Sequence, residues 1–194
     1  MPQVHELISQ VSRWLAWVAG GAILFGCASP IAIDVVSRAL VGRTVIESFE
    51  ISSYAFAACI GLGMGFTVSS KANIRVDILT AKLPRPLRLV FDLTASLALA
   101  ITALALAWYS FDVLSQSWKL GARSQSTLQV PLLFPQSIWW MGFVWFAAVA
   151  CLTPIFAILR LVTKDVDGAE ALISTPNLSD EIKEIGIDLE KPKP

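Results

Sequence analysis

Hydrophobic residues along this chain gather into four long runs that contain no charged residue. A helix that spans a bilayer needs roughly 20 apolar residues, with a range of about 17–25, and each run has a length in this range. Hydrocarbon offers no partners to free backbone N–H and C=O groups, so each run must be helical. The pattern predicts an all-α integral membrane protein with four transmembrane helices, built on the runs Trp14–Ile33, Ile51–Val68, Leu93–Phe111 and Ile138–Leu159.

Polar residues at the ends of the runs set the limits of the predicted membrane domain, residues 14–164. With these flanking residues included, the spans are predicted over 14–38, 48–69, 87–112 and 137–161. The segment Leu24–Cys27 loosely resembles the cleavage site of a lipoprotein signal peptide, which would remove the first span. The bulky Phe25 and the absence of a preceding basic cluster disfavour that alternative.

The two flanking segments carry weaker patterns. Apolar residues follow a helical period within residues 1–13, which indicates a short amphipathic helix on the membrane interface. A plain extension of the first span would give the same pattern, so both interpretations stay open. Residues 165–194 are polar and acidic, and we expect a loosely ordered tail. Leu172 and Ile173 could support a transient helix within it.

Positive charge is unequal among the connections and predicts the orientation. Cytoplasmic loops of membrane proteins carry the excess of Lys and Arg. The first connection holds only Arg38 and Arg43, and the third only Lys119 and Arg123. The middle connection is much richer, with Lys71, Arg75, Lys82, Arg85 and Arg88. The middle loop and both termini are therefore predicted on the cytoplasmic side.

Composition excludes several classes of function. Net charge is zero and no basic stripe is present, so nucleic acid is not an expected partner. Cys27, Cys59 and Cys151 lie inside apolar runs and form no CxxC pair, which argues against a disulfide framework. The only histidine is His5, and the sequence has no cluster of metal ligands and no nucleophile–base set. We therefore expect no metal, no cofactor and no enzymatic activity.

The interiors of the spans contain no ionisable residue. A protein that moves ions through its own core places such residues near mid-membrane, because they are costly there and persist only for use. Glycines are the notable feature instead, above all Gly61 and Gly63 in the second span. Small residues let helices approach closely, so these glycines predict close packing within the chain or against a partner.

Polar residues at the span ends are the remaining candidates for function. They are Asp34 with Arg38, Glu47 with Glu50, Arg75 with Asp77, and Pro131 before the fourth span. Asp34 and Arg38 are four residues apart, so they share a helix face. Such residues serve either as interfacial anchors and local ion pairs, each contributing little, or as contacts to another membrane subunit. The residues alone leave both interpretations open.

The order of these motifs resembles a known family. Asp34–Arg38, then Glu50 opening a span that contains Gly63, then Ala72–Leu79, is similar to the small permease subunit of tripartite ATP-independent periplasmic (TRAP) transporters. Val130–Trp139, which includes Pro131, resembles the segment before that family's fourth helix. The resemblance extends from Asp34 to Leu161, with Asn73 where the family has a histidine and Ile46 where an aromatic residue is common.

This resemblance implies a role in the bacterial inner membrane as a subunit that braces a large multi-span permease. In the family, the large subunit carries an organic acid anion with sodium, and a periplasmic binding protein delivers that substrate. Asp34, Arg38 and Glu50 would then order the outer ends of the first two helices, and Arg75 and Asp77 the inner loop. The alternative hypothesis is a self-contained four-helix exporter or channel that acts as a homo-oligomer.

Overall fold

The computed structural model describes residues 2–44, 46–72, 83–126 and 128–173, and within this part of the chain the fold is helical without named strands. Four helical segments, Glu6–Val41, Ser48–Ser69, Arg85–Leu120 and Leu133–Val162, are long and apolar enough to cross a membrane. The predicted all-α fold with four spanning helices is therefore confirmed.

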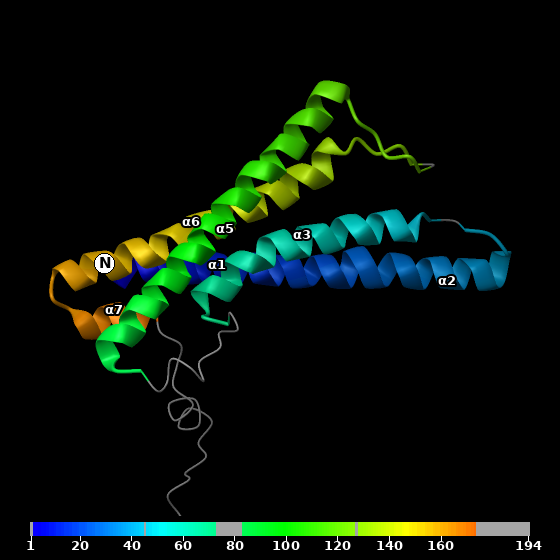
Figure 1. The fold of residues 1–194 in the computed structure, drawn as a ribbon. Helices are drawn as coiled ribbons and strands as arrows, with labels where there is room; N and C mark the ends of the chain where they lie inside the picture. Colours follow the sequence, from blue (N-terminus) through cyan, green and yellow to red (C-terminus); the bar gives the residue numbers. More distant parts are fainter. Residues whose placement is uncertain (1, 45, 73–82, 127, 174–194) are drawn as a thin grey trace, which may run out of the picture.

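The first span belongs to one long helical segment that starts near the N-terminus (Figure 1). It consists of α1 (Pro2–Ile23), the π-helix η1 (Leu24–Ala28) and α2 (Ser29–Val41). The Ser29 N–H bonds to the Leu24 carbonyl, five residues back, just before Pro30, which has no N–H to donate. Residues 2–13 are thus continuous with the first span in one helix. The interfacial position of this segment stays a prediction.

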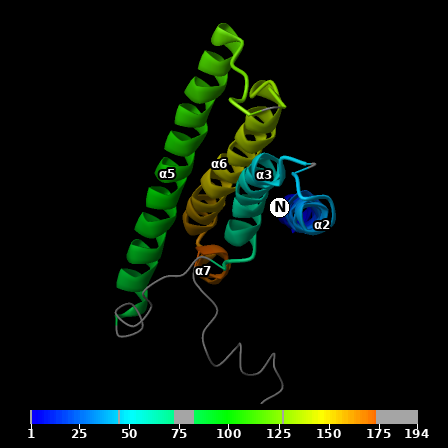
Figure 2. The same ribbon diagram turned by 90° about the vertical axis from the view of Figure 1, so that its right-hand side faces the viewer.

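The four spanning segments form a single row rather than a closed bundle (Figure 2). Helix α5 (Arg85–Leu120) packs on α6 (Leu133–Val162), α6 packs on α3 (Ser48–Ser69), and α3 packs on α1. Of the most apolar stretch in each span, 44% is buried in α6 but only 11% in the α1–α2 segment at the edge of the row. The two segments at the edges of the row, α5 and α1–α2, are therefore exposed along much of their length.

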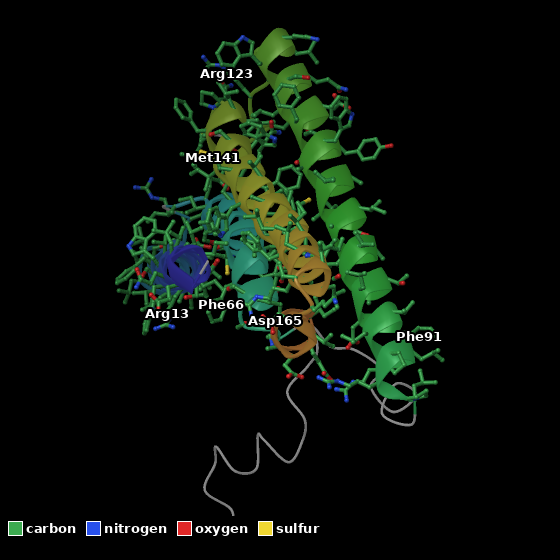
Figure 3. The ribbon with its side chains drawn as sticks, turned by 90° about the vertical axis from the view of Figure 1, so that its left-hand side faces the viewer. Arg13, Phe66, Phe91, Arg123, Met141 and Asp165 are labelled. Carbon is green, nitrogen blue, oxygen red and sulfur yellow. The ribbon has the colours of Figure 1, made fainter. Side chains whose placement is uncertain are left out.

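Helix α5 exposes large apolar side chains and buries small or polar ones, which is the reverse of a helix on the surface of a water-soluble protein. Its outward surface carries Phe91, Ile101 and Trp108, and Phe91 points away from the other helices in Figure 3. Its buried positions are all small or polar: Asp92, Ser96, Ala100, Ala103, Ser110 and Ser117. Small residues let membrane helices pack closely while bulky apolar residues face hydrocarbon, so this distribution fits a helix in a bilayer.

Glycines set the closest approach between α3 and α6. A Cβ atom on Gly142 would lie 2.3 Å from the Gly61 carbonyl carbon, and one on Gly61 would lie 2.9 Å from the Trp139 oxygen. Gly61 therefore lies at a close contact between α3 and α6. A Cβ on Gly63 would meet no heavy atom within 4 Å. The chain therefore leaves room for a methyl group at Gly63, and its predicted role in packing against a partner stays a prediction.

The two helix pairs separate toward one end of the molecule (Figure 1). We call this the two-loop end, because it holds the connections 42–47 and 121–132. We call the opposite end, where α7 packs against α6, the α7 end. Between the two ends the pairs come together, and Trp145, in the middle part of α6, donates a hydrogen bond of 3.2 Å to the fully buried Ser12 of α1. The pairs are therefore joined at mid-length of α6 and separate toward the two-loop end.

Helix α7 (Val166–Ile173) follows α6 and packs against it. These residues lie in the segment for which the composition indicated loose order, so that expectation is wrong over 166–173. The apolar residues Ala169 and Ile173 supply the reason, because both are buried. Residues 174–194 lie outside the described part of the chain.

Candidate functional site at the two-loop end

The Asp34 carboxylate holds α2 and α3 together at the two-loop end. Arg38 donates to it from Nε at 3.1 Å and from Nη2 at 2.6 Å, and the Ser48 hydroxyl donates to it at 2.8 Å. Asp34 and Arg38 lie one helical turn apart in α2, whereas Ser48 is the first residue of α3. The prediction that Asp34 and Arg38 share a helix face is confirmed. The residue of α3 that bonds to Asp34 is Ser48.

The two members of this ion pair differ strongly in exposure. The Asp34 side chain is 5% exposed and the Arg38 side chain 60%. An isolated carboxylate is costly to bury, and only good geometry and further hydrogen bonds offset that cost. Arg38 supplies two parallel charge-assisted bonds, the strongest arrangement available to a carboxylate, and Ser48 adds a third. The guanidinium therefore compensates a buried charge while its exposed side faces outward.

The chain between these helices turns at a glycine. Gly42 ends α2 with φ at 73°, a left-handed conformation, and its N–H bonds to the Arg38 carbonyl. Glycine adopts this conformation at little cost, so the chain leaves the helix sharply and returns as α3. Glu47 directly precedes α3, and its carbonyl accepts the Ile51 N–H at 3.3 Å. The structure thus places Glu47 at the helix start, as its sequence position predicted.

Glu50 connects α3 to a different part of the molecule. The Tyr54 hydroxyl, one turn further along α3, donates to Glu50 Oε1 at 2.5 Å. Glu50 Oε2 accepts a hydrogen bond from the Ser126 hydroxyl, and the Ser124 hydroxyl donates to Ser126 Oγ at 2.9 Å. Ser124 and Ser126 belong to the connection between α5 and α6. The two-loop end is therefore joined across the divergence of the helix pairs.

The connection 121–132 is folded back on itself, which fixes the position of its serines. Arg123 and Pro131 pair as an isolated antiparallel bridge, and the Ser124 N–H bonds to the Val130 carbonyl at 2.9 Å. The Ser126 N–H also bonds to Ser124 Oγ at 3.1 Å. Pro131 thus closes the base of this loop and precedes α6. In Figure 3, Arg123 marks the end of the α5–α6 pair that lies opposite to Asp165.

This arrangement joins helices through hydrogen bonds and an ion pair. Asp34 and Glu50 already accept hydrogen bonds from neighbouring side chains. Among the described residues, no group of three or more His, Cys, Asp or Glu side chains is placed to hold a metal ion. The site therefore has the character of a structural junction between spans.

The family model for tripartite ATP-independent periplasmic transporters, DctQ component, matches residues 27–162. The chain belongs to this family. The match begins in η1 and ends at the last residue of α6, so it contains both carboxylates and their partners. The family is a transporter component and not a family of enzymes. No curated protein matched the sequence.

Sequence reasoning about this DctQ component found some of the site and missed the rest. Asp34, Arg38 and Glu50 were singled out, but Glu50 was expected to order the first two helices and instead contacts the α5–α6 connection. Arg75 and Asp77 lie outside the described residues. The missed residues are all hydroxyl donors: Ser48, Tyr54, Ser124 and Ser126. Their only signal was a position at or near a span end, which many other residues share.

Proposed function

We propose that this DctQ component braces the large multi-span permease subunit of its transporter. In this proposal the complex takes up an organic acid anion together with sodium, and a periplasmic binding protein delivers the anion. The large subunit carries the substrate and the ions, and the present chain gives it a wide, stationary support in the bilayer.

The observation that carries this proposal is the row of helices, which is joined at mid-length and again at the two-loop end. In the middle part of α6 the row is held by Trp145 and Ser12, and at the two-loop end by the carboxylates of Asp34 and Glu50. A row with exposed edges offers long helix surfaces to another subunit. The interiors of the spans have no Asp, Glu, Lys, Arg or His, and a self-contained exporter would need such a residue for coupling. The homo-oligomeric exporter is therefore the weaker hypothesis.

We further infer that the α7 end faces the cytoplasm and that the membrane is the bacterial inner membrane. The described residues at the α7 end include six cations, Arg13, Lys71, Arg85, Arg88, Arg160 and Lys164. Those at the two-loop end are Arg38, Arg43, Lys119 and Arg123. Because cytoplasmic segments carry the excess of Lys and Arg, the α7 end, which has more of them, is assigned to the cytoplasmic side. Reaction of a membrane-impermeant maleimide with Arg43→Cys in intact spheroplasts, but not with Ser70→Cys, would agree with this orientation.

Photo-crosslinking in cells tests the partnership directly. A photoreactive amino acid replaces Ile101 on α5 or Phe25 on η1, which are 68% and 72% exposed and lie on the two edge segments. The buried Ala103 serves as the matched control. We expect at least one edge position to form an adduct with a larger, multi-span membrane protein. Adducts only between copies of this chain, from both edges, would contradict the brace and favour the homo-oligomer.

A further inference from the structure

Helix α7 turns back across the end of the row immediately after α6. Lys164, with φ at 62°, reverses the chain after α6. Asp165 then begins α7, because its Oδ1 accepts the Gly168 N–H at 2.9 Å as a helix cap. Arg160 of α6 contacts the other carboxylate oxygen of Asp165 at 3.3 Å. The turn and the start of α7 are therefore fixed to the end of α6.

Three spans contribute a cation to this short segment. Arg85, the first residue of α5, forms ion pairs with Asp167 and Glu170 of α7, with a distance of 2.9 Å to Glu170. Lys71, just after α3, donates a hydrogen bond to the Ala171 carbonyl. Together with Arg160 of α6, these contacts place one acidic segment against the ends of α3, α5 and α6.

The apolar face of α7 has a different set of contacts from the acidic face. Ala169 is fully buried and Ile173 is 3% exposed. Leu172 lines a small cavity that is also lined by Ile8 of α1 and Phe156 of α6. Burial of apolar surface does not depend on charge, so this face keeps α7 on the row whatever happens to its ion pairs.

The contact of α5 with α7 depends more on charge than the contact of α7 with α6 does. Helix α5 packs mainly against α6, and it also contacts α7. The side chains of Arg85 and Asp167 are 54% and 88% exposed. Exposed ion pairs are individually weak and become weaker as the ionic strength rises. The contact between α5 and α7 is thus the part of this end that ionic conditions can change.

We propose that α7 is an electrostatic strap: its apolar face stays on α6 while its acidic face holds the start of α5, and loss of the Arg85 ion pairs frees that end of α5. This role concerns movements within the chain and is independent of the bracing function. It assigns Asp167 and Glu170 to the positioning of α5 and gives the segment after α6 a conformational role.

Distance measurements between two spin labels test the strap. Labels are placed by Ser70→Cys after α3 and Val90→Cys on α5, both exposed, in the full chain in nanodiscs with the three native cysteines replaced by serine. We expect a narrow distance distribution in the parent protein and a broader one in Arg85→Ala. Combining Arg85→Glu with Asp167→Lys and Glu170→Lys should restore the narrow distribution. Lys119→Ala, at the opposite end of α5, is the matched control and should change nothing.

Salt provides a second measurement that does not rely on any charge variant being folded. Raising the ionic strength on the labelled parent protein should broaden the distribution as Arg85→Ala does, and dilution should reverse the change. An unchanged distribution in both Arg85→Ala and high salt would overturn the strap. A broadened distribution in Arg85→Ala that the charge-swapped variant fails to narrow would overturn it as well, because ion pairing would then not be the cause.

Discussion

Ser126, in the connection between α5 and α6, donates a hydrogen bond to the Glu50 carboxylate at the start of α3. The two residues are 76 positions apart in the sequence. They meet where the α5–α6 pair and the α2–α3 pair have separated (Figure 1). The contact therefore bridges the open side of the row.

The first prediction concerns this bridge. Ser126→Ala removes the donor, and Glu50→Gln removes the charge that strengthens the bond. Each change should lower the midpoint of thermal unfolding by a few degrees, measured by intrinsic fluorescence in detergent. The midpoint of the double variant should fall by less than the sum of the two single decreases, because both substitutions break the same contact. Ser115→Ala is the control, since the Ser115 hydroxyl bonds only within its own helix. Strictly additive losses would show that the two residues act separately.

The second prediction concerns Arg38. Arg38→Ala leaves the buried Asp34 carboxylate with the Ser48 hydroxyl as a cross-helix donor but without the charge of the Arg38 guanidinium. We expect a severalfold lower yield of the assembled transporter and a matching loss of uptake, with the substrate affinity of the binding protein unchanged. Arg38→Lys should recover only part of the yield, because an ammonium group cannot replace the paired Nε and Nη2 donors.

Arg43→Ala is the matched control for Arg38, since it removes an exposed arginine from the same end of the chain. Its yield and uptake should equal those of the unmodified protein. Unchanged uptake and complex yield in Arg38→Ala would show that the Asp34 junction has no part in assembly.

The third prediction separates two glycines. Gly142→Ala places a methyl group against the α3 backbone at Gly61 and should cost about 1–3 kcal/mol, as overpacking generally does. Gly63→Ala meets open space and should stabilise the isolated chain by about 0.4–1 kcal/mol, because alanine reduces the freedom of the unfolded state. Unfolding in SDS–detergent mixtures measures both. A loss for Gly63→Ala as large as that for Gly142→Ala would contradict the packing described for α3.

The fourth prediction uses Gly63→Ala to test whether Gly63 contacts another subunit. If Gly63 faces another subunit, Gly63→Ala should leave the isolated chain stable but reduce its recovery in complex with the large permease. Co-purification of the two subunits from membranes measures this recovery, and Gly20→Ala, on the open surface of α1, is the comparison. Full recovery of the complex with Gly63→Ala would remove the remaining predicted role of this glycine.

Much of the fold could be predicted from local patterns. Charge-free runs identified the four spans, because the bilayer requires a continuous apolar helix. The spacing of Asp34 and Arg38 predicted their pairing, because residues four apart on a helix are always neighbours. These features depend only on the chain near each residue.

Features that depend on the direction of another helix could not be predicted. Gly61 and Gly63 are two residues apart, so they point to nearly opposite sides of α3. Only the position of α6 decides that Gly61 packs. The contact from Ser126 to Glu50 likewise follows from the folding of residues 121–132, and the row arrangement follows from which helices pack together. For α7 the sequence indicated at most a transient helix, because the acidic residues around it suggested a solvated tail. Its stable position follows from cations of other helices that meet its acidic side chains.

Transport by reconstituted protein tests the bracing role most directly. Liposomes are prepared with this chain alone, with the large permease subunit alone, and with both, and uptake of the labelled substrate is measured with the binding protein and a sodium gradient present. We predict no uptake with this chain alone and full uptake only with both subunits. Uptake by this chain alone, without the large subunit, would contradict the account.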